Sequence, residues 1–119
     1  MRKLLIVAAF FMLTASMSFG QVKVEGVNIN ELDISYCRLS GINKGVFTEK
    51  IVITVDYGQK FKWWKTQRII GPNGKDIVFR SMVGALNFME KNGWTYVNNY
   101  AITDGKGGSV YHYLLKKKK

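Results

Sequence analysis

Apolar residues occupy every second position along two stretches of the chain. The first stretch runs from Leu32 to Cys37, and the second runs from Ile51 to Tyr57. A period of two residues is typical of a β-strand that buries one of its faces. Residues 40–49 lie between the two stretches and contain two glycines and an asparagine. This composition predicts a loop that joins two half-buried strands.

A tight-turn sequence stands in the middle of the chain. Gly71-Pro72-Asn73-Gly74 combines a proline, whose ring presets its φ angle, with residues that tolerate positive φ. Largely apolar segments precede it at 68–70, which ends in Ile69 and Ile70, and follow it at 76–79, after Asp76. Two apolar segments that flank so short a turn predict a β-hairpin.

One segment has the period of an α-helix. Four apolar residues recur at helical spacing and form one stripe: Met82, Ala85, Leu86 and Met89. Ser81 precedes the stripe as an N-cap, and Gly93 follows it as a C-terminal stop. Gly84 lies inside this helix, where glycine costs about 1 kcal/mol relative to alanine. Either the helix packs closely on a sheet at Gly84 or the helix is weak, and we predict the close packing.

The pattern changes again after the helix. Aromatic and β-branched residues dominate from Trp94 to Tyr100 and from Val110 to Leu115, which predicts two more strands. The connector, residues 104–109, contains glycine, lysine and serine. It lacks the order of a phosphate-binding loop and leads into a strand, so we interpret it as a hairpin turn. Trp94 is expected to be buried at the helix exit because tryptophan usually buries a large area.

These elements together predict an α+β fold, with an antiparallel sheet of about five strands and one helix packed on one face. The same part of the chain resembles small exported bacterial domains of unknown function. In that group a helix bearing Leu-Asn runs into Gly-Trp, and the last strand ends in Leu-Lys-Lys or Leu-Lys-Arg. The resemblance spans residues 32–117 and rests on five motifs: Val55-Asp56-Tyr57-Gly58-Gln59, Phe79-Arg80-Ser81, Ala85-Leu86-Asn87, Asn92-Gly93-Trp94 and Tyr113-Leu114-Leu115-Lys116-Lys117. It implies a compact antiparallel sheet with one helix, and it implies no activity.

Residues 1–20 have the pattern of an export signal. Two basic residues precede an apolar run from Leu4 to Leu13, and small residues follow up to Gly20. The run is shorter than the roughly 20 apolar residues that a membrane-spanning helix needs. We predict that residues 1–20 are removed on export to the periplasm or the cell exterior. Residues 21–119 then form one small domain with a basic C-terminal tail and no transmembrane segment.

The net charge of the chain favours anionic partners. The chain has 18 basic and 8 acidic residues, a formal net charge of +10. Positive charge attracts anionic lipid, lipopolysaccharide, acidic glycan and nucleic acid alike, and export disfavours the last of these. The run from Lys116 to Lys119 is expected to be a solvated tail, with attraction to an anionic envelope as the alternative.

The candidate binding residues lie in one stretch that mixes cations with aromatic rings: Lys60, Lys62, Trp63, Trp64, Lys65 and Arg68. Adjacent cations and flat rings suit sugars, anionic headgroups or nucleic-acid bases. The structural alternative is a strand or loop in which Phe61 and Trp63 enter the core while the lysines keep a sheet edge soluble.

Catalytic signals are weak. Cys37 is the only cysteine and His112 the only histidine, and no motif links them. A free cysteine is usually a small buried apolar residue, although an intermolecular disulfide is an alternative. One cysteine and one histidine do not supply the ligands of a zinc site. No cofactor or metal is indicated.

The sequence therefore predicts an exported, non-enzymatic module that binds a protein or an anionic envelope component, either glycan or lipopolysaccharide. A small thiol-dependent hydrolase that uses Cys37 and His112 is one alternative. A nucleic-acid-binding protein is another, if residues 1–20 are not an export signal. The sequence leaves the oligomeric state open.

Overall fold

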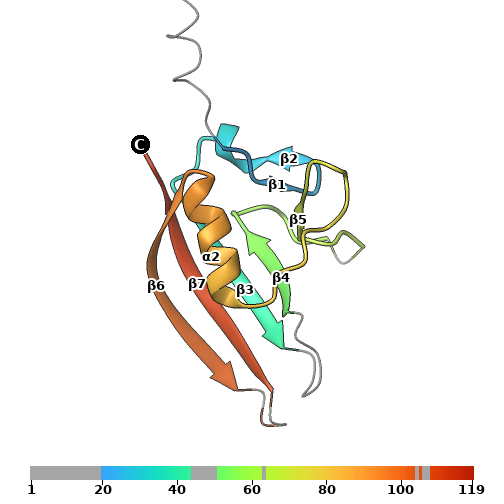
Figure 1. Ribbon diagram of the computed structural model, residues 1–119, viewed down its shortest axis with the longest axis vertical. Helices are drawn as coiled ribbons and strands as arrows, with labels where there is room; N and C mark the ends of the chain where they lie inside the picture. The colour runs from blue at the N-terminus through green and yellow to red at the C-terminus, as the bar shows by residue number, and fades with distance from the viewer. Residues whose placement is uncertain (1–19, 44–50, 63, 104, 106–107) are drawn as a thin grey trace, which may run out of the picture.

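The computed structural model describes residues 20–43, 51–62, 64–103, 105 and 108–119. Within these residues the fold is α+β, with one α-helix and two antiparallel sheets (Figure 1). The smaller sheet has the order β2-β1-β5, with β1 at Lys23–Val24, β2 at Val27–Asn28 and β5 at Ile69–Ile70. The larger sheet has the order β4-β3-β7-β6, with β3 at Tyr36–Asn43, β4 at Ile51–Asp56, β6 at Trp94–Thr103 and β7 at Ser109–Lys117. The helix α2 is Met82–Lys91, and a short 3₁₀-helix, η1, is Ile29–Glu31. The mixed fold class is confirmed, whereas the single sheet of five strands is wrong.

Of the two strands predicted by the two-residue period, one forms as predicted and the other begins at a later residue. β4 forms at Ile51–Asp56, as the alternation predicts. The other strand, β3, begins four positions later than expected and runs through the predicted loop as far as Asn43. Its glycine, Gly41, is a packing position and not a loop signal, because a Cβ there would overlap the Met82 sulfur of α2. The later part of that loop, residues 44–50, lies outside the described residues.

The tight turn forms, but the hairpin around it is minimal. The Gly74 amide donates to the Gly71 carbonyl at 3.0 Å, and Gly74 has a φ of 78°. The returning segment makes only isolated bridges, with Asp76 opposite Ile70 in β5 and Phe79 opposite Ile51 in β4. It therefore passes from the smaller sheet to the edge of the larger one instead of forming a full strand, while β5 pairs with β1.

The helix follows its sequence signals closely. The Ser81 Oγ accepts a hydrogen bond from the Gly84 amide at 3.1 Å, so Ser81 is the N-cap. Gly93 has a φ of 93° just beyond the helix, in the left-handed region that favours glycine. The predicted close packing at Gly84 is wrong, because the only atom near an added Cβ would be the Ser81 Oγ at 3.5 Å. The close approach of helix and sheet occurs at Gly41 instead.

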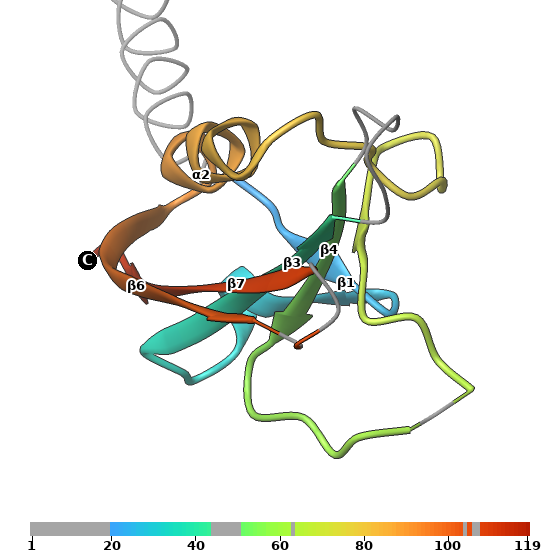
Figure 2. The ribbon, with the colours of Figure 1, turned by 90° about the horizontal axis from the view of Figure 1, so that it is seen from below.

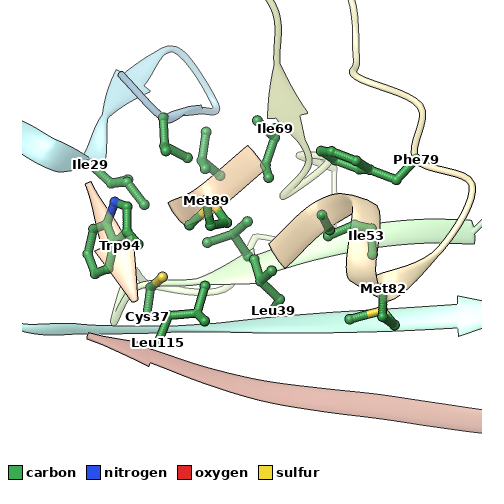
Figure 3. Packing of buried hydrophobic residues seen from close by; sticks show 14 residues of the cluster. Ile29, Cys37, Leu39, Ile53, Ile69, Phe79, Met82, Met89, Trp94 and Leu115 are labelled. Atoms are coloured by element: carbon green, nitrogen blue, oxygen red, sulfur yellow. The ribbon is translucent and has the colours of Figure 1, made fainter. Parts of the chain in front are cut away.

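One core lies between the larger sheet and a layer made of α2 and the smaller sheet (Figure 3). The helix contributes Met82, Ala85 and Met89, and the inner face of the larger sheet contributes Cys37, Leu39, Ile53, Val55, Trp94 and Leu115. Trp94 is fully buried, as predicted, and lies beside Ile29 of η1. These core side chains occupy one face of the larger sheet and leave its opposite face outside the core.

The predicted hairpin of β6 and β7 is confirmed, with Thr103 paired to Ser109 next to its connector. Two lysines of the C-terminal run, Lys116 and Lys117, belong to β7, so the sheet includes half of the predicted tail. Lys117 belongs to β7, and its Nζ donates to the Leu32 carbonyl at 2.5 Å. The Lys118 Nζ forms an ion pair with the Glu90 carboxylate of α2 at 2.5 Å. Backbone pairing therefore continues to Lys118, whose amide donates to the Gly93 carbonyl.

Candidate functional site

The outer face of the larger sheet is the side away from α2, and its side chains form rows across the strands. Strand register places Thr54, Ser40, His112 and Tyr100 in one such row, contributed by β4, β3, β7 and β6. The Ser40 Oγ lies 3.1 Å from the His112 Nδ1, and the His112 ring stacks on Tyr100 with centroids 4.6 Å apart. Ser40, His112 and Tyr100 are therefore in contact with one another along the row, and Thr54 lies beside Ser40 at its end.

The neighbouring row carries a charge pair. Arg38 of β3 stands opposite Asp56 of β4, and its guanidinium donates to the Asp56 carboxylate at 3.1 Å. Both side chains are half-exposed, so the pair contributes little to stability. The positive charge of Arg38 and partial burial both lower the pKa of His112, with burial the larger cause. At neutral pH the imidazole is therefore uncharged.

Residues 57–62 and 64–67 belong to a loop that leaves β4 and returns to it, on the side of the larger sheet away from α2 (Figure 2). We call these residues the anchored loop, because both of its ends are bonded to Val55. The Gln59 side chain donates to the Val55 carbonyl at 2.8 Å, and the Val55 amide donates to the Gln67 carbonyl at 2.7 Å. The Asp56 carboxylate also accepts from the Gly58 amide at 2.9 Å, which closes the first turn.

The tip of the anchored loop exposes the candidate residues. Lys60 and Lys65 are exposed, and the Phe61 and Trp64 side chains are 73% and 62% exposed. The Lys65 amide donates to the Lys62 carbonyl at 3.1 Å, so the tip turns instead of extending as a strand. The structural alternative, in which Phe61 and Trp63 enter the core, is therefore wrong for Phe61, and for Trp63 it falls outside the described residues.

Two of the predicted binding residues are not among those shown at this tip. Trp63 lies outside the described residues, so its part in binding stays a prediction. Arg68 is half-buried and forms an ion pair with Asp76 at 3.3 Å, near β5. Its charge is already partly compensated, so the three lysines of the anchored loop carry the local positive charge.

A hollow of about 290 Å³ lies between the anchored loop and the outer face of the sheet. The sheet contributes Arg38, Ser40, Thr54 and Asp56 to its walls, and the loop contributes Gln59, Phe61 and Gln67. Sequence analysis missed this hollow. The alternation along β4 could have placed Thr54 and Asp56 on one face, but Arg38 and Ser40 join them only through the register of β3.

The structure does not bring Cys37 and His112 together. Cys37 pairs with Leu115 and points into the core, whereas His112 pairs with Ser40 and faces outward. Burial, reinforced by the charge of Asp56, raises the pKa of Cys37 to about 12. The thiol is therefore protonated at neutral pH, a state in which it is a poor nucleophile. The expected burial of Cys37 is confirmed.

Three further observations complete the description. Among the described residues, no three His, Cys, Asp or Glu side chains cluster as metal ligands would. No helix in the same residues has the length and apolar character needed to span a membrane. Comparison of the chain with family models, curated proteins and solved structures finds no match.

Proposed function

We propose that the protein is an exported, non-enzymatic module that binds an anionic component of the cell envelope, an acidic glycan or lipopolysaccharide. One observation carries the proposal: a loop fixed at both ends presents two exposed aromatic rings among three lysines. Functional residues are often placed on loops held by a rigid scaffold. The anchored loop has this arrangement, because Val55 in β4 bonds both of its ends.

The lysines and the aromatic rings at the tip of the anchored loop have different roles in the proposed binding. Lys60, Lys62 and Lys65 attract an anionic polymer over a distance set by the ionic strength. Phe61 and Trp64 offer flat apolar faces that can stack on the ring of a bound sugar. Because these rings are already exposed in the free protein, binding needs no rearrangement of the core.

Export is part of the proposal and has its own test. The segment predicted as the signal precedes the described residues except for Gly20. We expect the protein recovered from the organism's envelope or medium to begin at Gln21, which amino-terminal sequencing would show. Recovery of an unprocessed chain from the cytoplasm would contradict export and would favour the nucleic-acid alternative.

The binding test uses immobilised polygalacturonate as the anionic probe, with elution by a salt gradient. Changing Lys60, Lys62 and Lys65 together to glutamine should lower the eluting salt concentration, because the contacts are electrostatic. The matched control changes Lys23, Lys91 and Lys119 to glutamine, which removes the same charge from other elements. Equal elution of the two triple variants would mean that net charge alone causes retention, and the proposal would be wrong.

A further inference from the structure

The hollow beside the anchored loop differs from the loop tip in charge. Its charged lining groups, Arg38 and Asp56, form an ion pair, and the other lining side chains are uncharged. The lysines of the tip are not among the described residues that line it. The hollow is therefore close to neutral, whereas its surroundings are positive.

The polar groups in the hollow divide into those that hold the loop and those that remain available. Gln59 uses both ends of its amide, since its Oε1 accepts from the Tyr57 amide and its Nε2 donates to Val55. Within the described residues, the Thr54 hydroxyl and the Gln67 side-chain amide make no hydrogen bond. A ligand that can both donate and accept hydrogen bonds would satisfy these groups.

Phe61 adds an apolar surface to this polar wall. Its ring lines the hollow and is still 73% exposed, so the ring stands at the rim. A volume of about 290 Å³ lies just below the range for ligand pockets, which is about 300–1,000 Å³. The space suits one ring-sized ligand with a hydroxylated edge and an apolar face.

We propose that the hollow binds one uncharged pyranose ring of a glycan, with its hydroxyls bonded to Thr54 and Gln67 and its C–H face against Phe61. This inference rests on the proposed envelope-binding function and specifies its ligand as a glycan. The acidic groups of the same polymer contact the lysines of the tip. Recognition therefore has two parts, a neutral ring in the hollow and anionic groups outside it.

The test separates the two parts by using neutral probes. We would titrate ¹⁵N-labelled protein with maltotetraose, cellotetraose, chitotetraose and mannotetraose and follow the amide resonances. At least one neutral sugar should shift the side-chain amide of Gln67 and the backbone amides around Thr54. The proposal fails if none of the four sugars shifts these resonances.

Variants identify the contacts that matter. Phe61→Ala should weaken binding of the neutral sugar roughly two- to tenfold, the loss of one stacking contact. Thr54→Val removes the hydroxyl but keeps the β-branched shape, so the strand should form and affinity should still fall. Val83→Ala is the control, because Val83 is an exposed apolar residue of α2 that does not line the hollow.

The outcomes distinguish this inference from the function on which it rests. Unchanged sugar binding in both Phe61→Ala and Thr54→Val would overturn the assignment of the hollow. If polygalacturonate retention still depended on the three lysines, the envelope-binding proposal would stand without it. If the two triple lysine variants eluted equally from polygalacturonate while neutral sugar still bound, the hollow would stand as a glycan site. The proposed contact of the three lysines with acidic groups would then be wrong.

Discussion

The indole N–H of Trp94 donates a hydrogen bond of 3.0 Å to the Oδ1 of Asn30, 64 positions earlier in the chain. The same oxygen accepts from the Val22 amide at 3.2 Å. The side-chain Nδ2 of Asn30 donates to the carbonyls of Gly20 at 2.9 Å and Asn92 at 2.6 Å. One side chain therefore connects the N-terminal segment to the junction of α2 and β6.

Replacing Asn30 with alanine should destabilise the fold. The change leaves the buried Trp94 indole without its partner and breaks the bonds to Val22 and Asn92. Three of the four bonds do not involve Gly20, so they persist in a chain that begins at Gln21. We expect a loss of about 2–4 kcal/mol in the free energy of unfolding, measured by urea denaturation.

Asn87→Ala is the control for this loss, because Asn87 is exposed on α2. It should change the free energy of unfolding by less than about 0.5 kcal/mol. Equal losses in the two variants would show that Asn30 has no special role.

Gly84→Ala should stabilise the protein. Gly84 is helical, and an added Cβ would meet only the Ser81 Oγ at an ordinary contact distance of 3.5 Å. Alanine lowers the conformational entropy of the unfolded chain, so we expect a gain of about 0.5–1 kcal/mol. Gly93→Ala should instead destabilise, because Gly93 has a φ of 93°. Thermal unfolding of the two variants checks the opposite signs.

The fold should weaken as the pH falls below about 6.5 because of His112. Burial and the charge of Arg38 lower the pKa of His112 in the folded state below its ordinary value of 6.5. Between the two values the unfolded chain holds more protons, so acid favours unfolding and the contribution of His112 is present only at higher pH.

The check compares urea denaturation at pH 7.5 and pH 5.5 in the wild type and in His112→Asn. The variant cannot titrate in this range, so its stability should change less between the two conditions. An equal change in both proteins would assign the pH dependence to other groups.

Cys37 should react slowly with thiol reagents while the protein is folded. The side chain is buried, and its pKa is raised to about 12, so almost no thiolate is available at pH 8. Labelling by an aromatic disulfide reagent should become fast when urea unfolds the chain. Rapid labelling of the native protein would contradict the burial of this thiol.

A substitution tests the same burial independently. Cys37→Ser places a hydroxyl in an apolar core and should cost about 1–3 kcal/mol more than a conservative apolar change would. Cys37→Ala is that comparison. The free energies of unfolding of the two variants give the cost of the hydroxyl directly.

Elements with strong local signals were predictable. The helix from Met82 to Lys91 follows its apolar period and its N-cap, and the hairpin after it follows its aromatic and β-branched composition. By contrast, β1 and β2 have two residues each, which is too short to show a period. The smaller sheet was therefore missed, because its pairing of Val24 with Ile69 joins distant parts of the chain.

Two glycines show that the local sequence does not reveal why a glycine is present. Gly41 and Gly84 both interrupt an apolar pattern, and only the tertiary structure distinguishes their roles. A side chain at Gly41 would overlap Met82 of a different element, whereas a Cβ at Gly84 would make only an ordinary contact with the Ser81 Oγ. The reason for a glycine can lie in a neighbour that the local sequence does not contain.

Some features of the candidate site could be predicted from the sequence, and others could not. The amino-acid sequence alone determined that Lys60, Lys62 and Lys65 accompany aromatic residues, since adjacency along the chain needs no fold. Only the tertiary structure placed Phe61 at the rim of a hollow with side chains of β3 and β4. Periodicity, capping and turns arise from contacts within a few residues and can be read locally. Strand register and loop anchoring arise from hydrogen bonds between distant segments, and these bonds exist only after the chain has folded.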